Sequence, residues 1–220
     1  LRLNKVKLTL DPLNFKINAK TIGTKILYKK KIIELEYIKT TISLWSLIEN
    51  KIVSSNLRIS SKSVLLKDLV AFIRTTNNKP ELFFLEHVIK KGYVVVNANL
   101  KFDKNGKIKD DFKISVFLKE GKIKLLDNYN FENINFFLNF KKDLMSFEDI
   151  KFTTNKINFI SDNLILKKNN KEFFFEGMIR NENSILNNQL LDLINLNHQD
   201  INIKNINFNS KNKFSFKIDD

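Results

Sequence analysis

The stretch VVVNANLKFDKNGKIKDDFKISVFLKEGKIKL, residues 94–125, decides the fold class. Apolar and polar residues alternate on both sides of Asn105-Gly106, and the second run meets another turn at Glu120-Gly121. A period of two places every second side chain on one face of a β-strand. Asn-Gly between two such runs is a strong hairpin signal. The stretch therefore predicts successive antiparallel strands that share one apolar face.

The same period extends through most of the chain in both directions. It recurs at Val6–Leu10, Leu13–Ala19 and Ile33–Tyr37 toward the N-terminus, and at Ile134–Phe140 and Phe214–Ile218 toward the C-terminus. We expect about 14 strands of about 5–8 residues, joined mainly by short turns. No linker rich in Pro or Gly divides the chain, so residues 1–220 are interpreted as a single unit.

Four segments have helical rather than strand periodicity. Residues 43–48 follow a capping Ser43, and residues 65–74 place Leu, Val and Ile on one side of a helix. Residues 80–90 begin with a Pro, which the first turn of a helix tolerates, and residues 184–194 begin with a capping Ser. We expect short helices in all four. They are too scattered for β-α-β units, so the sheet is expected to be antiparallel.

A weak internal repeat precedes two of the strands. Phe131-Glu132-Asn133-Ile134 and Phe147-Glu148-Asp149-Ile150 share one pattern of aromatic, acidic, Asn or Asp, and Ile residues. Two copies suggest a stacked array of similar units.

Composition argues against an enzyme. The chain has no Cys and two His, His87 and His198, which excludes thiolate sites and leaves no set of residues for a metal. Its five Gly are spread singly, without a phosphate-binding loop, and no Gly-x-Ser-x-Gly motif is present. We therefore expect no catalytic residue, no metal and no cofactor.

Charge is concentrated in the first half of the chain. Residues 1–110 hold 22 Lys and Arg against 9 Asp and Glu, whereas residues 111–220 hold 16 against 15. A basic half attracts anionic surfaces, either nucleic acid or a membrane. A compositional bias toward Lys, Asn, Ile and Phe explains the same excess without a ligand. No apolar run reaches the roughly 18 residues that a membrane-spanning helix needs.

Four segments resemble the AsmA-like family. IKTTISLWSLI at residues 38–48 and IVSSNLRI at 52–59 resemble the strand, short turn and strand of that family. ISDNLILK at 160–167 and FFFEGMI at 173–179 resemble its recurrent strand pair with a Gly in the second strand. The membrane helix that usually begins family members is missing here, and we expect an anchor upstream of Leu1.

The resemblance implies a long, twisted antiparallel sheet that curls into an open apolar groove. It also implies a non-enzymatic conduit segment, which carries phospholipid acyl chains between the inner and outer membranes of a diderm bacterium. The location implied is the periplasm or cell envelope, with inner-membrane anchoring in the full-length protein. The implied partners are phospholipid, the membrane and other envelope proteins, and no nucleic acid.

The apolar face of an alternating sheet must be covered, by a second sheet or by acyl chains. A single sheet of about 14 strands is about 65 Å long, which makes the chain one segment of a longer conduit. The expected lining residues are Leu13, Phe15, Ile17, Ile33, Leu35, Tyr37, Val94, Val96, Leu100, Phe102, Ile114, Val116, Leu118, Phe136, Leu138, Phe140, Phe173 and Phe175.

Two alternatives stay open at this point. The first is an envelope or outer-membrane assembly scaffold whose apolar residues form the closed core of a β-sandwich. The second is a basic β-protein that binds nucleic acid, with exposed aromatic residues as stacking platforms.

Overall fold

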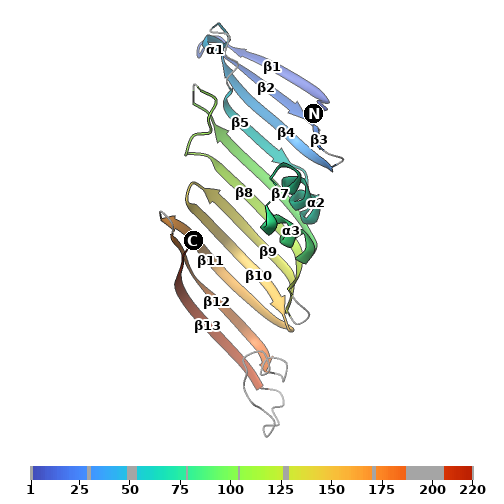
Figure 1. Cartoon of the computed structure of the whole chain (residues 1–220), viewed down its shortest axis with the longest axis vertical. Coiled ribbons are helices and arrows are strands. Elements are labelled where there is room, and N and C mark those ends of the chain that lie inside the picture. Colours follow the sequence, from blue (N-terminus) through green and yellow to red (C-terminus); the bar gives the residue numbers. More distant parts are fainter. Residues whose placement is uncertain are drawn as a thin grey trace.

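A computed structural model describes residues 2–28, 31–48, 54–77, 79–103, 105–125, 129–169, 172–186 and 206–219. Strands dominate these residues (Figure 1). The strands are β1 (Lys5–Asp11), β2 (Lys16–Ile22), β3 (Lys25–Tyr28), β4 (Lys31–Ser43), β5 (Ser54–Ser61), β6 (Val64–Leu65), β7 (Ile89–Lys101), β8 (Lys113–Leu125), β9 (Tyr129–Lys141), β10 (Leu144–Thr154), β11 (Ile157–Asn169), β12 (Glu172–Leu186) and β13 (Ile206–Asp219). The helices are α1 (Leu44–Ile48), α2 (Leu66–Thr76) and α3 (Pro80–Val88).

All 13 strands form one antiparallel sheet. Its main path runs β1-β2-β4-β5-β7-β8-β9-β10-β11-β12-β13, while β3 pairs with β4 and β6 pairs with β7 beside it. The sheet is not closed, because β1 and β13 end the path. At about 4.8 Å per interval the path is about 50 Å long. That is shorter than expected because β3 and β6 do not extend it. The prediction of one mainly β, open antiparallel sheet is confirmed.

Three of the four expected helices are present, with small shifts at their ends. Residues 44–48, 66–76 and 80–88 are helical. The prediction for residues 184–194 is wrong at its start, because Ser184 to Leu186 belong to β12 and pair with Phe208 to Ile206 of β13. Pairing with a neighbouring strand outweighs the local capping preference of Ser184. The rest of that segment lies outside the described residues.

The strand register separates the sheet into an apolar and a polar face. Residues that pair directly across antiparallel strands point to the same side. One row crosses all eleven strands of the main path, and with one exception it is apolar. This long apolar row consists of Val6, Thr21, Ile38, Ile59, Ala98, Ile114, Phe140, Met145, Leu166, Phe175 and Phe216. We call its side the apolar face and the other side the polar face.

Bulges interrupt four of the long strands, at heights that drift by about five residues in register between β10 and β12. Glu120 in β8, Asn133 in β9, Asp149 in β10 and Asn183 in β12 all have a φ angle between 50° and 53°. Left-handed backbone inside a strand marks a bulge, which bends the strand. The register also shifts at the corresponding heights of β7 and β11. Together these bulges form a line across the sheet, which we call the crease.

The crease is concave on the apolar face. Each left-handed residue is exposed, while the residue that follows it is buried. The buried followers are Gly121, Ile134, Ile150 and Ser184. Side chains inside a bend are covered by both arms of the bent strand, whereas those outside it face solvent. The repeat Phe-Glu-Asn/Asp-Ile of the sequence is therefore the signature of a bulge and its buried follower.

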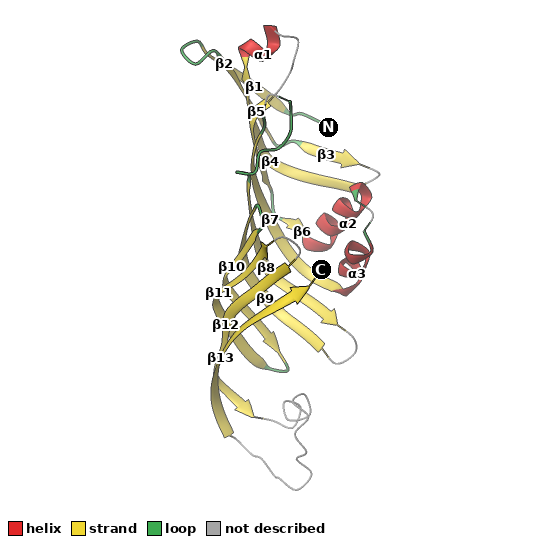
Figure 2. Cartoon of the chain, turned by 60° about the vertical axis from the view of Figure 1, so that its left-hand side comes forward, coloured by secondary structure: helices red, strands yellow, loops and turns green. Residues whose placement is uncertain are grey.

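Helices α2 and α3 cover one end of the apolar face. Figure 2 shows both helices on the same side of the sheet, and α2 packs against β7 and β4. A Cβ atom on Gly92 would lie 3.5 Å from Cβ of Leu66 and 3.3 Å from Cδ1 of Leu118, so the start of α2 lies over the apolar face. Val70 and Ala71 of α2 are buried there. Most of the buried apolar side chains of the described residues lie under or in these two helices.

The rest of the apolar face stays open. The accessible surface of the chain is 15271 Å². A compact monomer of 25.9 kDa would expose about 10,500 Å². Among the described residues 11 apolar side chains are buried, and they lie near the helices or along the crease. The described residues contain no second sheet that opposes the first, so the alternative of a closed sandwich core is wrong for this part of the chain.

Candidate functional site

The candidate site is the apolar face between the crease and the hairpin ends of β7 to β13. A second row runs beside the long apolar row and is apolar throughout. It consists of Val96, Val116, Leu138, Phe147, Leu164, Gly177 and Phe214. These side chains are half-buried rather than sealed. Two parallel apolar rows with no covering layer among the described residues make an open trough.

Aromatic rings line the trough from β9 onward. Phe136 and Phe147 meet edge to face with their centroids 5.5 Å apart. Phe175 lies 5.4 Å from Phe214 and 5.2 Å from Phe216. Edge-to-face and offset ring contacts of this kind stabilise the pairs beyond simple burial. The rings therefore hold one another on the sheet while one side of each remains available.

A cleft of about 190 Å³ marks the hairpin end of the trough. Its apolar walls include Phe140, Met145, Leu166 and Phe173. At its rim the ammonium of Lys168 lies 4.9 Å from the centroid of the Phe173 ring. A cation over an aromatic face is attracted by the ring quadrupole. Asp143 lines the same cleft, so the apolar wall meets one positive and one negative side chain at the edge where the trough opens to solvent.

Fourteen of the eighteen expected lining residues lie on the apolar face. They are Ile17, Ile33, Leu35, Val94, Val96, Leu100, Ile114, Val116, Leu118, Phe136, Leu138, Phe140, Phe173 and Phe175. Four of these, Ile33, Leu35, Val94 and Leu118, are buried near the helices, so they form core rather than open surface.

The other four expected lining residues lie elsewhere. Leu13 and Phe15 belong to the turn between β1 and β2, beyond the strands. Phe102 lies past the end of β7, in an isolated bridge with Ile108. Tyr37 pairs with Ser60 whereas Leu35 pairs with Ser61, so one extra residue in β4 turns Tyr37 to the polar face.

Sequence reasoning also missed residues on the apolar face. The bulge in β4 shifts the alternation by one residue, so that Ile38 and Ile42 face the same side as Leu35. Met145 and Phe147 of β10 were not chosen either. Acidic residues follow Phe147 in the repeat, but the spacing of two between Met145 and Phe147 is visible in the sequence. Aligning each strand with its neighbour would have placed Met145 opposite Phe140 and Phe147 opposite Leu138 on the apolar face.

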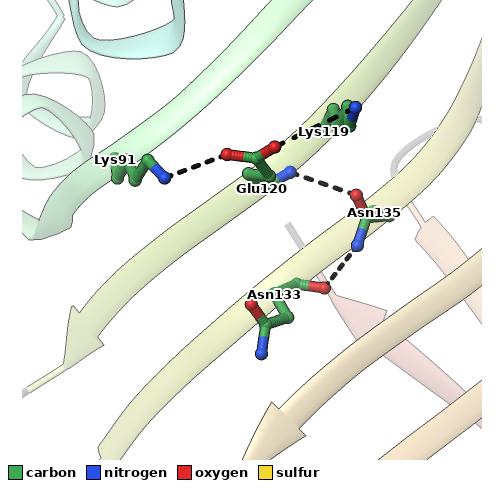
Figure 3. A network of polar contacts seen from close by, with 5 residues as sticks. All are labelled: Lys91, Lys119, Glu120, Asn133 and Asn135. Carbon is green, nitrogen blue, oxygen red and sulfur yellow. Dashed lines mark hydrogen bonds and ion pairs between the residues drawn. The ribbon is translucent and has the colours of Figure 1, made fainter.

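The polar face satisfies the backbone groups that the crease frees (Figure 3). The side chain of Asn135 accepts a hydrogen bond from the amide of Glu120 at 3.0 Å and donates one to the carbonyl of Asn133 at 2.6 Å. Asn209 accepts from the amide of Asn183 in the same way. Buried or half-buried backbone groups left unpaired are costly. Asn on the neighbouring strand therefore stabilises the bulges.

Ion pairs cover the same part of the polar face. Glu120 binds Lys91 at 2.9 Å, and this hydrogen bond together with the charge of Lys91 lowers the pKa of the Glu120 carboxyl. The same contact raises the pKa of Lys91. Glu34 accepts from Lys25 and Lys62, which lowers its pKa. None of these groups is buried, so their shifts reflect surface pairing and not a catalytic environment.

Catalytic and metal-binding groups are sparse in the described part of the chain. His87 is exposed on α3, and its Nδ1 lies 2.9 Å from the carbonyl oxygen of Phe83. His198 lies outside the described residues. Within the described ranges no three His, Cys, Asp or Glu side chains are grouped to hold a metal ion. Across the same ranges no helix has the length and hydropathy to span a bilayer.

Comparisons with known proteins identify no relative. The chain matches no family model, no curated protein and no solved structure. The site must therefore be interpreted from its own geometry.

Proposed function

We propose that this chain is a segment of a lipid conduit, whose open trough holds the acyl chains of phospholipids while their head groups stay in water. The observation that supports this most is the long apolar row, which continues through every strand of the main path. A soluble sheet buries such a face. Here most of it is covered by nothing in the described residues, so an apolar ligand is the natural cover.

The dimensions of the trough suit an acyl chain. Residues 134–141 of β9 run from the crease to the hairpin end, and eight residues of a strand span about 27 Å. The hydrocarbon layer of one leaflet is about 15 Å thick, half of the bilayer core. One arm of the trough is therefore long enough to cover a tail from end to end.

The trough offers little that would hold a lipid at one place. The side chains of Asn181 and Ser161, buried near the crease, bond to the protein itself, to the carbonyls of Phe208 and Asn163 respectively. The two apolar rows of the trough consist otherwise of Ile, Leu, Val and Phe, with Ala98, Met145 and Gly177. Each CH₂ kept out of water is worth about 0.8 kcal/mol wherever it lies along the trough. A tail thus gains the same free energy at successive strands, which favours movement along the sheet.

The cellular role in this proposal follows the resemblance to the AsmA-like family. The chain would work in the envelope of a diderm bacterium, between its inner and outer membranes and together with other envelope proteins. It needs no cofactor and no catalytic residue for this role. A main path of about 50 Å would make it one part of a longer conduit.

Site-specific photo-crosslinking tests the occupant of the trough. A photoreactive phenylalanine analogue replaces Leu138 or Val116 on the apolar face, and the matched controls replace Phe137 or Phe117. The controls are the adjacent residues of the same strands, and their rings stack 4.5 Å apart on the polar face. We expect crosslinks to phospholipid from Leu138 and Val116 and none from the controls. Equal crosslinking from both faces would refute a trough-specific site.

A blocking variant tests passage along the trough. Leu138→Glu places a charge on the half-buried surface of the trough, where water can still reach it. We expect the sheet to stay folded by circular dichroism and lipid transfer between vesicles to fall, while Phe137→Glu leaves transfer unchanged. If Leu138→Glu unfolds the chain, the position belongs to a closed core and the proposal loses its basis.

A further inference from the structure

Four cations lie in one row on the polar face of the first strands. Lys7 of β1 pairs with Lys20 of β2, Lys20 with Lys39 of β4, and Lys39 with Arg58 of β5. All four line a single hollow of about 420 Å³. We call these four residues the basic row. At about 4.8 Å per strand, the row is about 14 Å long.

Among the described residues none of the four cations of the basic row forms an ion pair, and Lys39 lies over the ring of Tyr37, 4.8 Å from its centroid. Glu36 reaches the same face beside the row, but its carboxylate accepts a hydrogen bond from the hydroxyl of Ser60 at 3.2 Å. Like charges directly opposite each other across strands destabilise a sheet. By contrast, Lys122, Lys167 and Lys217 in the later strands each bind a Glu on a neighbouring strand. Folding gains nothing from this repulsion, whereas an anionic surface would relieve it.

An apolar tip projects from the same end of the molecule. Leu13 in the turn between β1 and β2 is 97% exposed, and Trp45 and Ile48 of α1 are 63% and 65% exposed. The rings of Phe15 and Trp45 lie 4.9 Å apart, and the amide of Leu44 donates to the carbonyl of Phe15. These contacts join the turn and α1 into one unit. We call Leu13, Phe15, Trp45 and Ile48 the tip.

The tip and the basic row are close enough to act on one surface. Lys7 is four residues before Asp11, where β1 ends, which places the row about 13 Å behind the turn. Asp11 adds one negative charge at the tip, but its carboxylate accepts hydrogen bonds from Asn14. Trp and other large apolar side chains favour the interface of a bilayer, and Lys and Arg near it are attracted to anionic head groups.

We propose that this end of the molecule docks on an anionic membrane surface, with the tip inserted among the lipids and the basic row against their head groups. The inference deepens the proposed function, because it assigns the end at which the trough meets a bilayer. Nucleic acid fits the surface less well. Single strands need exposed aromatic platforms, and the described polar face of β1, β2, β4 and β5 has only Tyr37, which Lys39 covers.

Vesicle binding, followed by the emission of Trp45, tests the proposal. Trp45 is the single Trp of the chain, so its spectrum reports the tip without a label. The whole chain is mixed with phosphatidylcholine vesicles that contain or lack phosphatidylglycerol. We expect binding and a blue shift of Trp45 only with phosphatidylglycerol, and weaker binding as salt is added. Binding that ignores phosphatidylglycerol, or an unchanged Trp45 spectrum, overturns the proposal.

Two sets of variants separate the row from the tip. The triple variant Lys20→Gln, Lys39→Gln, Arg58→Gln should bind these vesicles on the order of 100-fold more weakly, since each cation near an anionic surface is worth about 1 kcal/mol. Because the variant also removes repulsion, its urea midpoint should not fall. Leu13→Ser should weaken binding roughly tenfold while leaving the fold unchanged, because Leu13 touches little of the protein.

The matched control removes the same charge elsewhere. Lys151, Lys156 and Lys213 are exposed and lie in the later half of the sheet. Their triple Gln variant should bind the vesicles like the unmodified chain. An equal loss in this control, or tighter binding to single-stranded DNA than to the anionic vesicles at one ionic strength, overturns the membrane assignment. Crosslinking at Leu138 is independent of this outcome, so failure of either proposal leaves the other measurable.

Discussion

The first strands and the last strands of this sheet share one apolar face but differ in the side-chain interactions on their two faces. β1, β2, β4 and β5 carry an aliphatic face and an unpaired basic row on the other side. β8 to β13 carry Phe contacts on the apolar face and ion pairs on the polar one. Of the 20 Phe in the chain, 5 lie in residues 1–110 and 15 in residues 111–220.

The crease adds a second difference between the two regions. Left-handed bulge residues occur in β8, β9, β10 and β12, and buried followers lie behind them. In β1 the apolar side chains are fully open, with Leu8 67% exposed. The later region thus obtains its own stability from bending and ring contacts. The early region leaves its polar face and the apolar face of β1 and β2 available for contact with other molecules, whereas α2 covers part of β4.

The largest expected effect contrasts two aliphatic residues on the same face. Ile150 is buried behind the crease, so Ile150→Ala should lower the free energy of unfolding by about 2–5 kcal/mol through lost burial and a cavity. Leu8→Ala in β1 should change it by less than about 0.5 kcal/mol. Urea unfolding followed by circular dichroism measures both. Similar losses for the two variants would show that the regions do not differ in packing.

Gly177 gives the next effect, because β11 approaches β12 closely there. A Cβ atom at Gly177 would lie 2.3 Å from Cδ2 of Leu164 and 3.0 Å from the carbonyl oxygen of Asn163. Gly177→Ala should therefore cost about 1–3 kcal/mol. Adding Leu164→Ala removes the side-chain clash but leaves the backbone one. The double variant should then be more stable than the sum of the two single losses, and strict additivity in urea unfolding would contradict this packing.

The crease itself is tested at a bulge residue. Asp149 has a φ of 52°, so Asp149→Val should cost about 1–2 kcal/mol, because a β-branched side chain is strained in left-handed backbone. Asp149→Gly should cost nothing or stabilise the sheet. Thermal unfolding of the two variants is compared with that of Asn97→Val, at an exposed position in β7. A larger loss for Asn97→Val would place the strain outside the crease.

A smaller effect contrasts the charges of the two regions. Lys20→Glu replaces the cation of the basic row that faces both Lys7 and Lys39, and it should stabilise the chain by about 0.2–1 kcal/mol. Lys122→Glu in β8 faces Glu132, to which Lys122 now binds at 2.6 Å, and should destabilise by a similar amount. Opposite shifts of the urea midpoint at low salt are expected, and both should shrink as salt is added. Shifts of the same sign would remove the electrostatic contrast.

The smallest effect is a dependence on pH. The pKa of Glu120 lies below its ordinary value of 4.5, because Lys91 donates to it. A lowered pKa in the folded state means that the pair stabilises the chain above pH 4.5 and that this contribution fades as the pH falls through the folded pKa. In the Glu120→Gln variant the free energy of unfolding should therefore fall slightly less steeply as the pH is lowered. Since the pair is exposed, an effect as large as that of Ile150→Ala would contradict surface pairing.

Much of the fold was predictable because the period of two survives in most strands. Hairpin signals such as Asn105-Gly106 fixed the order of the strands, and three helices were visible from their spacing and caps. Each misassigned residue lies at a bulge, in a turn or opposite a partner strand. At these places the period of two and the capping preference no longer decide the structure. The bulge of β4 turned Tyr37 to the polar face, and β13 drew Ser184 into a strand.

The sequence predicted which residues lie on the apolar face better than it predicted how much of that face is left uncovered. Alternation placed fourteen of the eighteen expected lining residues on the apolar face, because it reports on which side of a strand a side chain lies. It does not report whether another layer covers that side, which depends on contacts between distant residues. The tip and the basic row were missed for a related reason. Lys7, Lys20, Lys39 and Arg58 are far apart in sequence and meet only through the strand register.

The open edges of the sheet also bear on how such a protein changes its size over evolutionary time. Each added hairpin contributes two strands, about 10 Å of path, and continues the apolar rows without turning any existing side chain to the other face. Duplication or loss of a hairpin at β1 or β13 therefore alters the reach of the molecule in discrete steps and leaves its inner chemistry intact.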